Sequence, residues 1–363
     1  MAQVIQALLP VVMALVTAWL FVWPSYRSRR ARLVWCVFLA FCGSRMWPAI
    51  FFWNCTSAPG WPMWLLVFWN WAYAGMVVLF LVSLIWRVRF GRRFLLPFVA
   101  WAVATAGMVG AMAFPRINPV EIPFRNLPDS LDGYRIVQLS DLHLSPAFPA
   151  SRMKRLVAAV NRLSPDLVCL TGDYSGGETE VVADTLSLIT ELKAKDGVLA
   201  VTGNHEYYRD WWAWRPYYKR WGVRFLTNDC VRVRSGLTVG GVNDLEVLRW
   251  GLENPPDENR VFESAAYGDF RLLLSHRPRY AHDNVERRGV DLQLSGHTHG
   301  GLMPILSLAA KLRDRGFVRG LYRFPHGGAL YVTTGVGPWD TLPFRFGCPP
   351  EIALITLRKE KTP

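Results

Sequence analysis

The chain has 363 residues, of which 51% are hydrophobic and 19% charged, and its formal net charge is +13. This apolar content is unusual for a wholly soluble protein and indicates a membrane segment. Residues 1–116 hold ten arginines and no Asp or Glu, which leaves 31 basic against 28 acidic residues in the remainder. Because the remainder has no strong basic excess of its own, the charge argues against nucleic-acid binding.

Four apolar stretches near the N-terminus are long enough to cross a bilayer, which takes about 20 helical residues. They cover residues 5–23, 33–53, 61–86 and 94–114, so residues 1–116 are expected to form a transmembrane region of four helices. Arginines gather in the loops after the first and third stretches and are absent from the second loop. The positive-inside rule makes the arginine-rich loops cytoplasmic. All residues after 114 are therefore expected to be extracytoplasmic.

Arg45 falls near the middle of the second stretch, where a charge facing lipid is costly. Two interpretations remain open at this point. Either Arg45 contacts a lipid phosphate or an intramembrane partner, or it snorkels or faces the helix bundle with Asn70 nearby. After the last stretch, residues 117–133 are rich in prolines and predict an extended linker near the membrane surface.

From residue 134 to residue 363, short apolar runs alternate with amphipathic stretches, which predicts an α/β domain. Its first part is expected to hold strands at 135–140, 167–171 and 198–202, and helices at 151–163, 180–193 and 206–214. Further strands are expected at 231–242, 270–274, 292–294, 330–333 and 352–357. This order predicts two mixed sheets packed face to face.

The carboxyl ends of five predicted strands deliver Asp, Asn and His side chains. In chain order these candidates are Asp141, His143, Asp173, Asn204, His205, His276, His297 and His299. Loops at this edge of such a sheet are where sites are built. So many carboxylates and imidazoles cannot be buried together cheaply without a cation. Oxygen and imidazole ligands without thiolate predict Mn, Fe, Zn or Ni, and a pair of such ions suits phosphoryl displacement.

These residues carry a resemblance. The strings Asp141-x-His143, Gly172-Asp173, Gly203-Asn204-His205-Glu206, His276 and Gly296-His297-x-His299 resemble the five blocks of the calcineurin-like metallophosphoesterases. The resemblance covers residues 134–363 and implies a four-layer αββα sandwich. It implies one divalent metal ion on Asp141, His143, Asp173 and His299, and a second on Asp173, Asn204, His276 and His297. It also implies that His205 is the catalytic residue, a general acid and not a ligand. Manganese is the expected metal, with iron, zinc or nickel as alternatives.

The strings GNHEYY and LSGHTHGG are similar to a membrane-associated branch that includes bacterial UDP-2,3-diacylglucosamine pyrophosphohydrolase-like proteins. This resemblance implies a metal-dependent hydrolase of the bacterial inner membrane, acting on a phosphodiester or diphosphate bond in a lipid-linked substrate. The best named candidate is that nucleotide lipid of lipid A biosynthesis.

The nucleotide lipid belongs to the cytoplasmic leaflet, whereas the arginine loops place the domain outside. The alternative is therefore an extracytoplasmic phosphodiesterase acting on a phospholipid, an undecaprenyl-type diphosphate or a cell-wall polymer. A non-catalytic scaffold or sensor is disfavoured, because His205 and the seven implied ligands are all present.

Two segments near the predicted site raise the question of lipid contact. Residues 211–221 carry six aromatic side chains interleaved with basic ones, which suits either a helix packed on the sheet or a membrane-interface belt. Residues 302–312 are apolar and then basic, which favours an interfacial position. The active site is therefore expected to face the bilayer.

The remaining histidines and cysteines carry less information. His282 and His326 match no block and are expected to be surface or packing residues. Of the six cysteines, only Cys230 and Cys348 are candidates for a disulfide. The compartment is therefore predicted from the arginine loops alone.

Overall fold

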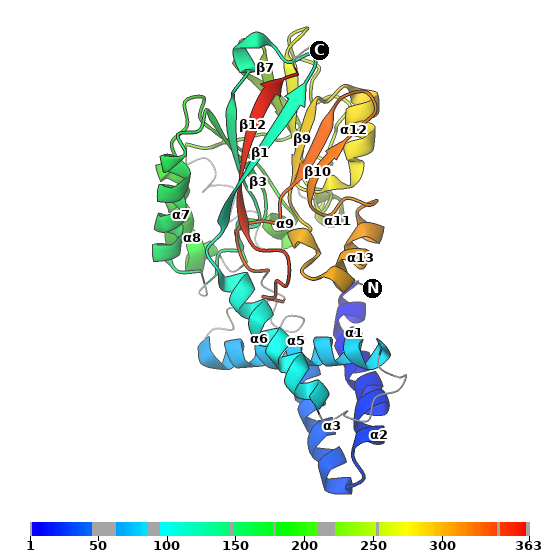
Figure 1. Cartoon of the computed structure of the whole chain (residues 1–363). Helices are drawn as coiled ribbons and strands as arrows, with labels where there is room; N and C mark the ends of the chain where they lie inside the picture. Colours follow the sequence, from blue (N-terminus) through cyan, green and yellow to red (C-terminus); the bar gives the residue numbers. More distant parts are fainter. Residues whose placement is uncertain are drawn as a thin grey trace. The chain divides into compact units, whose positions relative to one another are not determined.

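The computed structural model describes residues 2–45, 63–85, 95–145, 148–176, 179–208, 222–251, 254–339 and 342–360 (Figure 1). The chain divides into two compact units. The helical unit holds Met1–Met112 and Trp339–Phe346, and the sheet unit holds Ala113–Pro338 and Gly347–Pro363. We describe each unit by itself.

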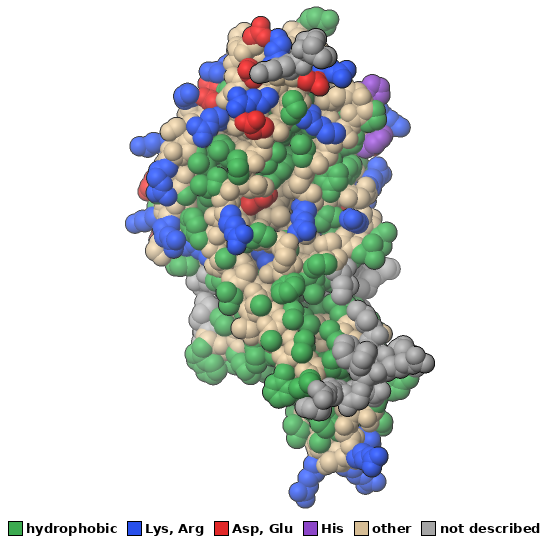
Figure 2. All heavy atoms as spheres, in the orientation of Figure 1, with side chains coloured by type: hydrophobic (Ala, Val, Ile, Leu, Met, Phe, Trp, Pro, Cys, Tyr) green, Lys and Arg blue, Asp and Glu red, His purple; other side chains and the backbone are tan. Residues whose placement is uncertain are grey.

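The helical unit contains α1 (Ala2–Thr17), η1 (Ala18–Val22), α2 (Trp23–Ser25), α3 (Arg29–Gly43), α5 (Met63–Ile85) and α6 (Leu96–Met112). Two stretches, Leu8–Ser25 and Trp64–Leu84, are long and apolar enough to cross a membrane, and Leu96–Met112 is a shorter apolar helix. Hydrophobic side chains cover much of the surface of these helices (Figure 2). Membrane association is therefore supported. The four-span arrangement stays a prediction, because residues 46–53 of the expected second span and the whole third loop lie outside the described residues.

Arg45 is buried in the helical unit, with 1% of its surface exposed. Its Nε donates a hydrogen bond of 2.7 Å to Oδ1 of Asn70, and its guanidinium lies 5.9 Å from the ring centroid of Trp69. A buried charge needs polar partners to offset the loss of its hydration. Of the two interpretations of Arg45, the structure favours the one in which it faces the bundle near Asn70.

Residues 342–346 belong to the helical unit, although their position in the sequence placed them in the α/β domain. The backbone N–H of Arg345 donates a hydrogen bond of 2.8 Å to the carbonyl of Gly107 on α6. A Cβ on Gly107 would lie 2.1 Å from the ring of Phe344. Glycine at position 107 is therefore what lets this segment lie against the helix.

Two six-stranded mixed sheets form the centre of the sheet unit, as predicted. The first has the order β1 (Arg116–Phe124), β12 (Glu351–Lys359), β2 (Arg135–Leu139), β3 (Leu167–Thr171), β4 (Val198–Val201) and β5 (Arg224–Phe225). The second has the order β10 (Gly320–Arg323), β11 (Ala329–Val332), β9 (Leu292–Ser295), β8 (Phe270–Leu274), β7 (Leu237–Gly241) and β6 (Asp229–Arg234). Strands β2 to β5 are parallel, and so are β7, β8 and β9. Parallel neighbours place their carboxyl ends at one edge of the sheet.

Helices cover both outer faces of this pair of sheets (Figure 1). The helices of the unit are α7 (Ala150–Arg162), α8 (Thr179–Ser187), α9 (His205–Tyr208), α11 (Val247–Trp250), α12 (Ala281–Arg288) and α13 (Pro304–Arg313), with short 3-10 segments η3 (Asp129–Leu131), η4 (Leu188–Glu191), η5 (Pro278–Tyr280) and η6 (His299–Gly301). One apolar core joins the two sheets, with Leu199 and Leu272 among its residues. A second joins the first sheet to α7 and α8, and Val285 of α12 packs with Leu273 of β8. The order of layers is helix, sheet, sheet, helix.

The segment expected as a linker differs from the prediction. Residues 116–124 form β1, which pairs in parallel with β12 along its whole length. Pro119 and Pro123 are compatible with this strand because β1 lies at the edge of the sheet, with a partner on one side only. The sheet unit therefore begins well before residue 134.

Two other segments also differ from the prediction. Residues 231–242 do not form one strand, because Gly236 adopts φ +85° between β6 and β7 and the two strands pair as an antiparallel hairpin. The expected helix at 206–214 is described only as α9. The rest of it, with the aromatic segment 211–221, lies outside the described residues.

Candidate metal centre

All the predicted site residues follow strands that end at the same region of the two sheets. Asp141 and His143 follow β2, Asp173 follows β3, Asn204 and His205 follow β4, His276 follows β8, and His297 and His299 follow β9. Three overlapping groups have ligand atoms within 4.8 Å of one another: Asp141, His143 and His299; His143, Asp173 and His205; and Asp173, His276 and His297. The fold therefore brings together side chains up to 158 positions apart, from Asp141 to His299.

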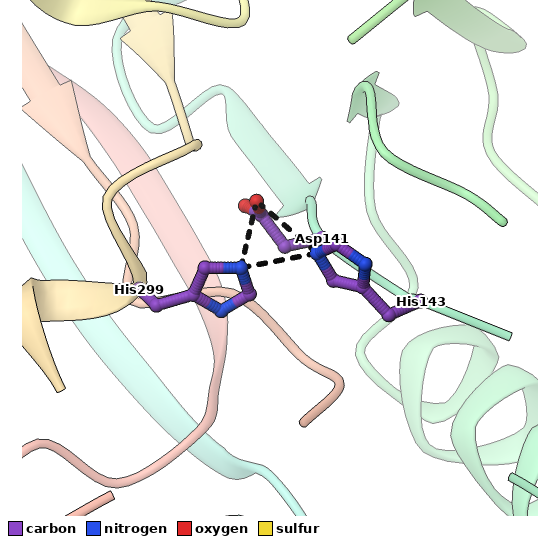
Figure 3. A group of neighbouring side chains, drawn as sticks. All are labelled: Asp141, His143 and His299. Carbon is purple, nitrogen blue, oxygen red and sulfur yellow. Dashed lines mark hydrogen bonds and ion pairs between the residues drawn. The ribbon is translucent and has the colours of Figure 1, made fainter. Parts of the chain in front are cut away.

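The first group is drawn in Figure 3, where both imidazoles point toward the carboxylate of Asp141. The Nε2 atoms of His143 and His299 are 3.0 Å apart. Oδ1 of Asp141 lies 3.5 Å from Nε2 of His299 and 4.0 Å from Nε2 of His143. Two imidazole nitrogens and a carboxylate oxygen converge on one point, which is the arrangement expected of metal ligands.

The third group centres on Asp173. Its Oδ2 lies 3.1 Å from Nε2 of His276 and 3.9 Å from Nε2 of His143, so Asp173 lies between the first group and the third. Nδ1 of His297 is 3.2 Å from Nε2 of His276. Nδ1 of His276 is 2.7 Å from the carbonyl of Thr171, which can only accept a hydrogen bond. This contact places a proton on Nδ1 and orients Nε2 toward the site, as is usual for ligating histidines.

Asn204 and His205 complete the site. Oδ1 of Asn204 is buried and has no hydrogen-bond partner among the described residues. A buried acceptor of this kind costs free energy unless something binds it, so it fits a metal ligand. His205 is more exposed than His143, the other histidine of its group, and the two ring centroids lie 4.4 Å apart. The backbone N–H of His205 donates a hydrogen bond of 2.8 Å to Oδ1 of Asp173.

The backbone is strained at this site. Five candidate ligands have positive φ angles: Asp141 (53°), His143 (45°), Asp173 (57°), His297 (72°) and His299 (48°). Such conformations are uncommon for residues other than glycine and persist where the surroundings impose them. Gly203 gives the room this requires, since a Cβ there would lie 2.2 Å from Oδ1 of Asp173. The strain is concentrated on the residues that would bind metal.

The electrostatics of the cluster keep Asp173 ionised. Burial alone would raise the pKa of Asp173, but the neighbouring imidazoles of His276 and His205 hold it well below its usual range. Burial would lower the pKa of His276, yet the carboxylates of Asp173 and Asp141 raise it to about 10. The pKa of His297 is lowered well below its usual range by burial and by the charge of Arg277. The donor set, its burial and the acceptor on Asn204 all fit divalent cations.

The sequence has relatives that agree with this geometry. Residues 134–301 match the family model described as calcineurin-like phosphoesterase. An uncharacterized metallophosphoesterase of Campylobacter jejuni is 30% identical over 268 residues, covering 70% of this chain and 67% of its own length. The chain belongs to the calcineurin-like phosphoesterase family.

Two other relatives of this phosphoesterase are informative. A Danio rerio protein named as a transmembrane protein with metallophosphoesterase domain is 33% identical over 71% of this chain and 60% of its own length. An uncharacterized metallophosphoesterase of Aquifex aeolicus is 29% identical over 68% of this chain and 92% of its own length. The chain thus spans about three fifths of the length of the Danio rerio relative.

Glu206 makes hydrogen bonds next to the metal centre that its sequence context did not reveal. Its buried carboxylate accepts hydrogen bonds from the backbone N–H groups of Gly203 (2.7 Å), Asp173 (2.9 Å) and Tyr174 (2.8 Å). Burial and the charge of Asp173 raise the pKa of Glu206 to about 7, while these N–H groups oppose the rise. Glu206 therefore ties together the loops after β3 and β4, which carry Asp173 and Asn204. Its only sequence signal is its place directly after His205.

A charged cluster next to the site was also missed. Nε of Arg277 lies 2.9 Å from Oδ2 of Asp244, and its Nη2 lies 3.2 Å from Oε2 of Glu246. Arg277 adjoins His276 in the sequence, but the two carboxylates lie more than 30 positions earlier. No local pattern links them, so only the packing of the loop after β7 against the loop after β8 reveals the cluster.

The histidines and cysteines outside the blocks have other partners. The ring of His326 contacts the carboxylate of Glu286 at the surface, and the ring of His282 lies 6.0 Å from that of Phe324. Cys230 and Cys348 are not joined by a disulfide. The two histidines are thus surface and packing residues, as expected.

Proposed function

We propose that this phosphoesterase is a membrane-anchored enzyme that uses two divalent metal ions to hydrolyse a phosphodiester or diphosphate bond in a lipid-linked substrate. The single observation that carries the proposal is the position of Asp173 between two groups of imidazole and carboxylate donors. The lipid part is supported by the two stretches long enough to cross a membrane and by the name of the Danio rerio relative.

The residues divide into ligands and a proton donor. Asp141, His143, Asp173 and His299 would hold one metal ion, and Asp173, Asn204, His276 and His297 the other. Such a pair would lower the pKa of coordinated water and offset charge on the phosphoryl group. Manganese is our first choice of metal. His205 would donate a proton to the leaving oxygen, a role suited to an imidazole with access to solvent.

The location of the catalytic unit determines which lipids it meets. We propose four spans in the bacterial inner membrane with the sheet unit outside the cytoplasm, on the strength of the arginine loops. An extracytoplasmic unit would act on a phospholipid or an undecaprenyl-type diphosphate. A cytoplasmic unit would instead meet UDP-2,3-diacylglucosamine. A Tyr267→Cys variant labelled with an impermeant maleimide in intact spheroplasts distinguishes the two, because Tyr267 is fully exposed.

The test of the function is hydrolysis by the purified full chain with Mn²⁺. The substrates are a generic aryl phosphodiester, a short-chain phospholipid and UDP-2,3-diacylglucosamine, and the His205→Ala variant serves as the control. We expect hydrolysis of a lipid substrate to exceed that of the aryl diester and to be lost in the variant. Equal rates on all substrates would refute the lipid preference, and activity retained in His205→Ala would refute the assigned proton donor.

A further inference from the structure

Helix α13 of the sheet unit presents an apolar face to solvent. Leu308 is 63% exposed and Leu312 is 80% exposed. The two are four residues apart, so they lie on the same side of the helix, and the exposed Pro304 extends this side by one more turn. Figure 2 shows hydrophobic side chains at the surface around the position of α13. Contiguous exposed apolar side chains mark a contact surface.

Cationic side chains surround this face. Lys311 and Arg313 on α13 are exposed, as are Arg315 and Arg319 just beyond it. The only acidic residue between positions 302 and 319 is Asp314, which is buried and pairs with Arg313 at 3.0 Å. Arg315 pairs with Asp283 of α12 at 3.5 Å, so Lys311 and Arg319 are the exposed cations of this set without an acidic partner among the described residues. An exposed apolar stripe with a cationic rim complements the headgroup layer of an anionic bilayer, where leucines enter the acyl boundary and cations meet phosphates.

The helix is attached to the loop that carries two candidate ligands. Ser307 on α13 lies against Gly300, with a hydrogen bond of 3.5 Å from its hydroxyl to the Gly300 carbonyl. The hydroxyl of Thr298 donates to the carbonyl of Val318, beyond the other end of α13. Ser307 and Val318, on either side of Leu308 and Leu312 in the sequence, are thus hydrogen-bonded to residues 298–300, between and beside His297 and His299. A surface that binds α13 is therefore held at a constant distance from the metal centre.

We propose that α13 lies in the headgroup layer of an anionic phospholipid bilayer and holds the metal centre against it. The apolar face enters the bilayer surface, and Lys311 contacts lipid phosphates. A consequence, which rests on the proposed function, is that the enzyme cleaves phosphoric esters at headgroup depth. The contact itself does not depend on that function, and its test below requires no activity.

The experiment measures the depth of a spin label on the full chain in lipid nanodiscs. Leu312→Cys is labelled with a nitroxide. To keep the label at this position, the partly exposed Cys36 and Cys230 are replaced by serine, and so is Cys55. The matched control is a label at Tyr267, which is fully exposed. Tyr267 precedes strand β8, whereas His276 of the metal centre follows β8. The control therefore lies at the end of the sheet away from the metal centre. Accessibility to oxygen and to a water-soluble nickel chelate gives the depth.

We expect the Leu312 label to be lipid-embedded in nanodiscs containing phosphatidylglycerol, and the Tyr267 label to remain aqueous. Lys311→Glu changes two charge units, so it should lower the ratio of docked to undocked helix about 30-fold. An aqueous label at Leu312 in these nanodiscs would overturn the proposal. Equal embedding of the label in nanodiscs of phosphatidylcholine alone would refute the requirement for an anionic lipid. Dipolar coupling between labels on two chains would show instead that this surface binds a second copy of the chain.

Discussion

Replacement of Glu206 tests whether one buried carboxylate holds together the loops that carry the candidate ligands Asp173 and Asn204. In Glu206→Gln, the amide keeps its oxygen where the N–H groups of Gly203 and Asp173 converge and turns its NH₂ toward the N–H of Tyr174. One hydrogen bond becomes a contact between two buried donors, and the other two remain. A buried donor left without an acceptor costs about 1–3 kcal/mol, and this contact leaves two of them. We expect the free energy of unfolding at pH 8, above the raised pKa of Glu206, to fall by about 3 kcal/mol.

The assay is thermal unfolding of the full chain in EDTA, so that metal binding makes no contribution. For a domain of this size, about 3 kcal/mol corresponds to a fall in Tm of about 6–12 °C. Glu191→Gln is the matched control, because Glu191 is exposed and its side chain has no hydrogen bond among the described residues. If the Tm of Glu206→Gln stays within about 2 °C of that control, the three backbone hydrogen bonds do not support the loops as we argue.

Further predictions concern the reacting groups and their surroundings. His205→Asn should lower kcat about 10²- to 10⁴-fold with unchanged metal content, measured by steady-state kinetics and elemental analysis. Asp173→Asn should lower the bound metal itself, because its carboxylate lies between both donor groups. Gly203→Ala should abolish activity in the same assay, since its Cβ would meet Oδ1 of Asp173 at 2.2 Å. Arg277→Met leaves the buried carboxylate of Asp244 without its partner and should lower the free energy of unfolding by about 3 kcal/mol, measured by denaturant titration.

Each of these has an outcome that would contradict it. If His205→Asn loses as much metal as Asp173→Asn, His205 is a ligand, as its place near His143 also allows. Full activity in Gly203→Ala would show that the loop after β4 can move away from Asp173. An Asp244→Leu change added to Arg277→Met should restore part of the lost stability, and no recovery would show that the unpaired carboxylate was not the cause.

Much of the sheet unit could be predicted from local sequence. The expected strands at 167–171 and 198–202 lie within one residue of β3 and β4, because strands buried on both faces appear as short continuous apolar runs. The types of the site residues were predicted for a similar reason, since each stands directly after such a run. Strand β1 was not predicted, because its prolines and polar residues form a strand only through pairing with β12, more than 200 positions away.

The amino-acid sequence by itself determined the kinds of candidate ligands, their order along the chain and the division between apolar helices and an α/β unit. These properties follow from residue chemistry and short-range periodicity, which are local. Only the tertiary structure decided the left-handed backbone at Asp141 and Asp173, the support of two loops by Glu206, and the contact of residues 342–346 with α6. Such features depend on which distant segments pack against one another, and no local pattern encodes that.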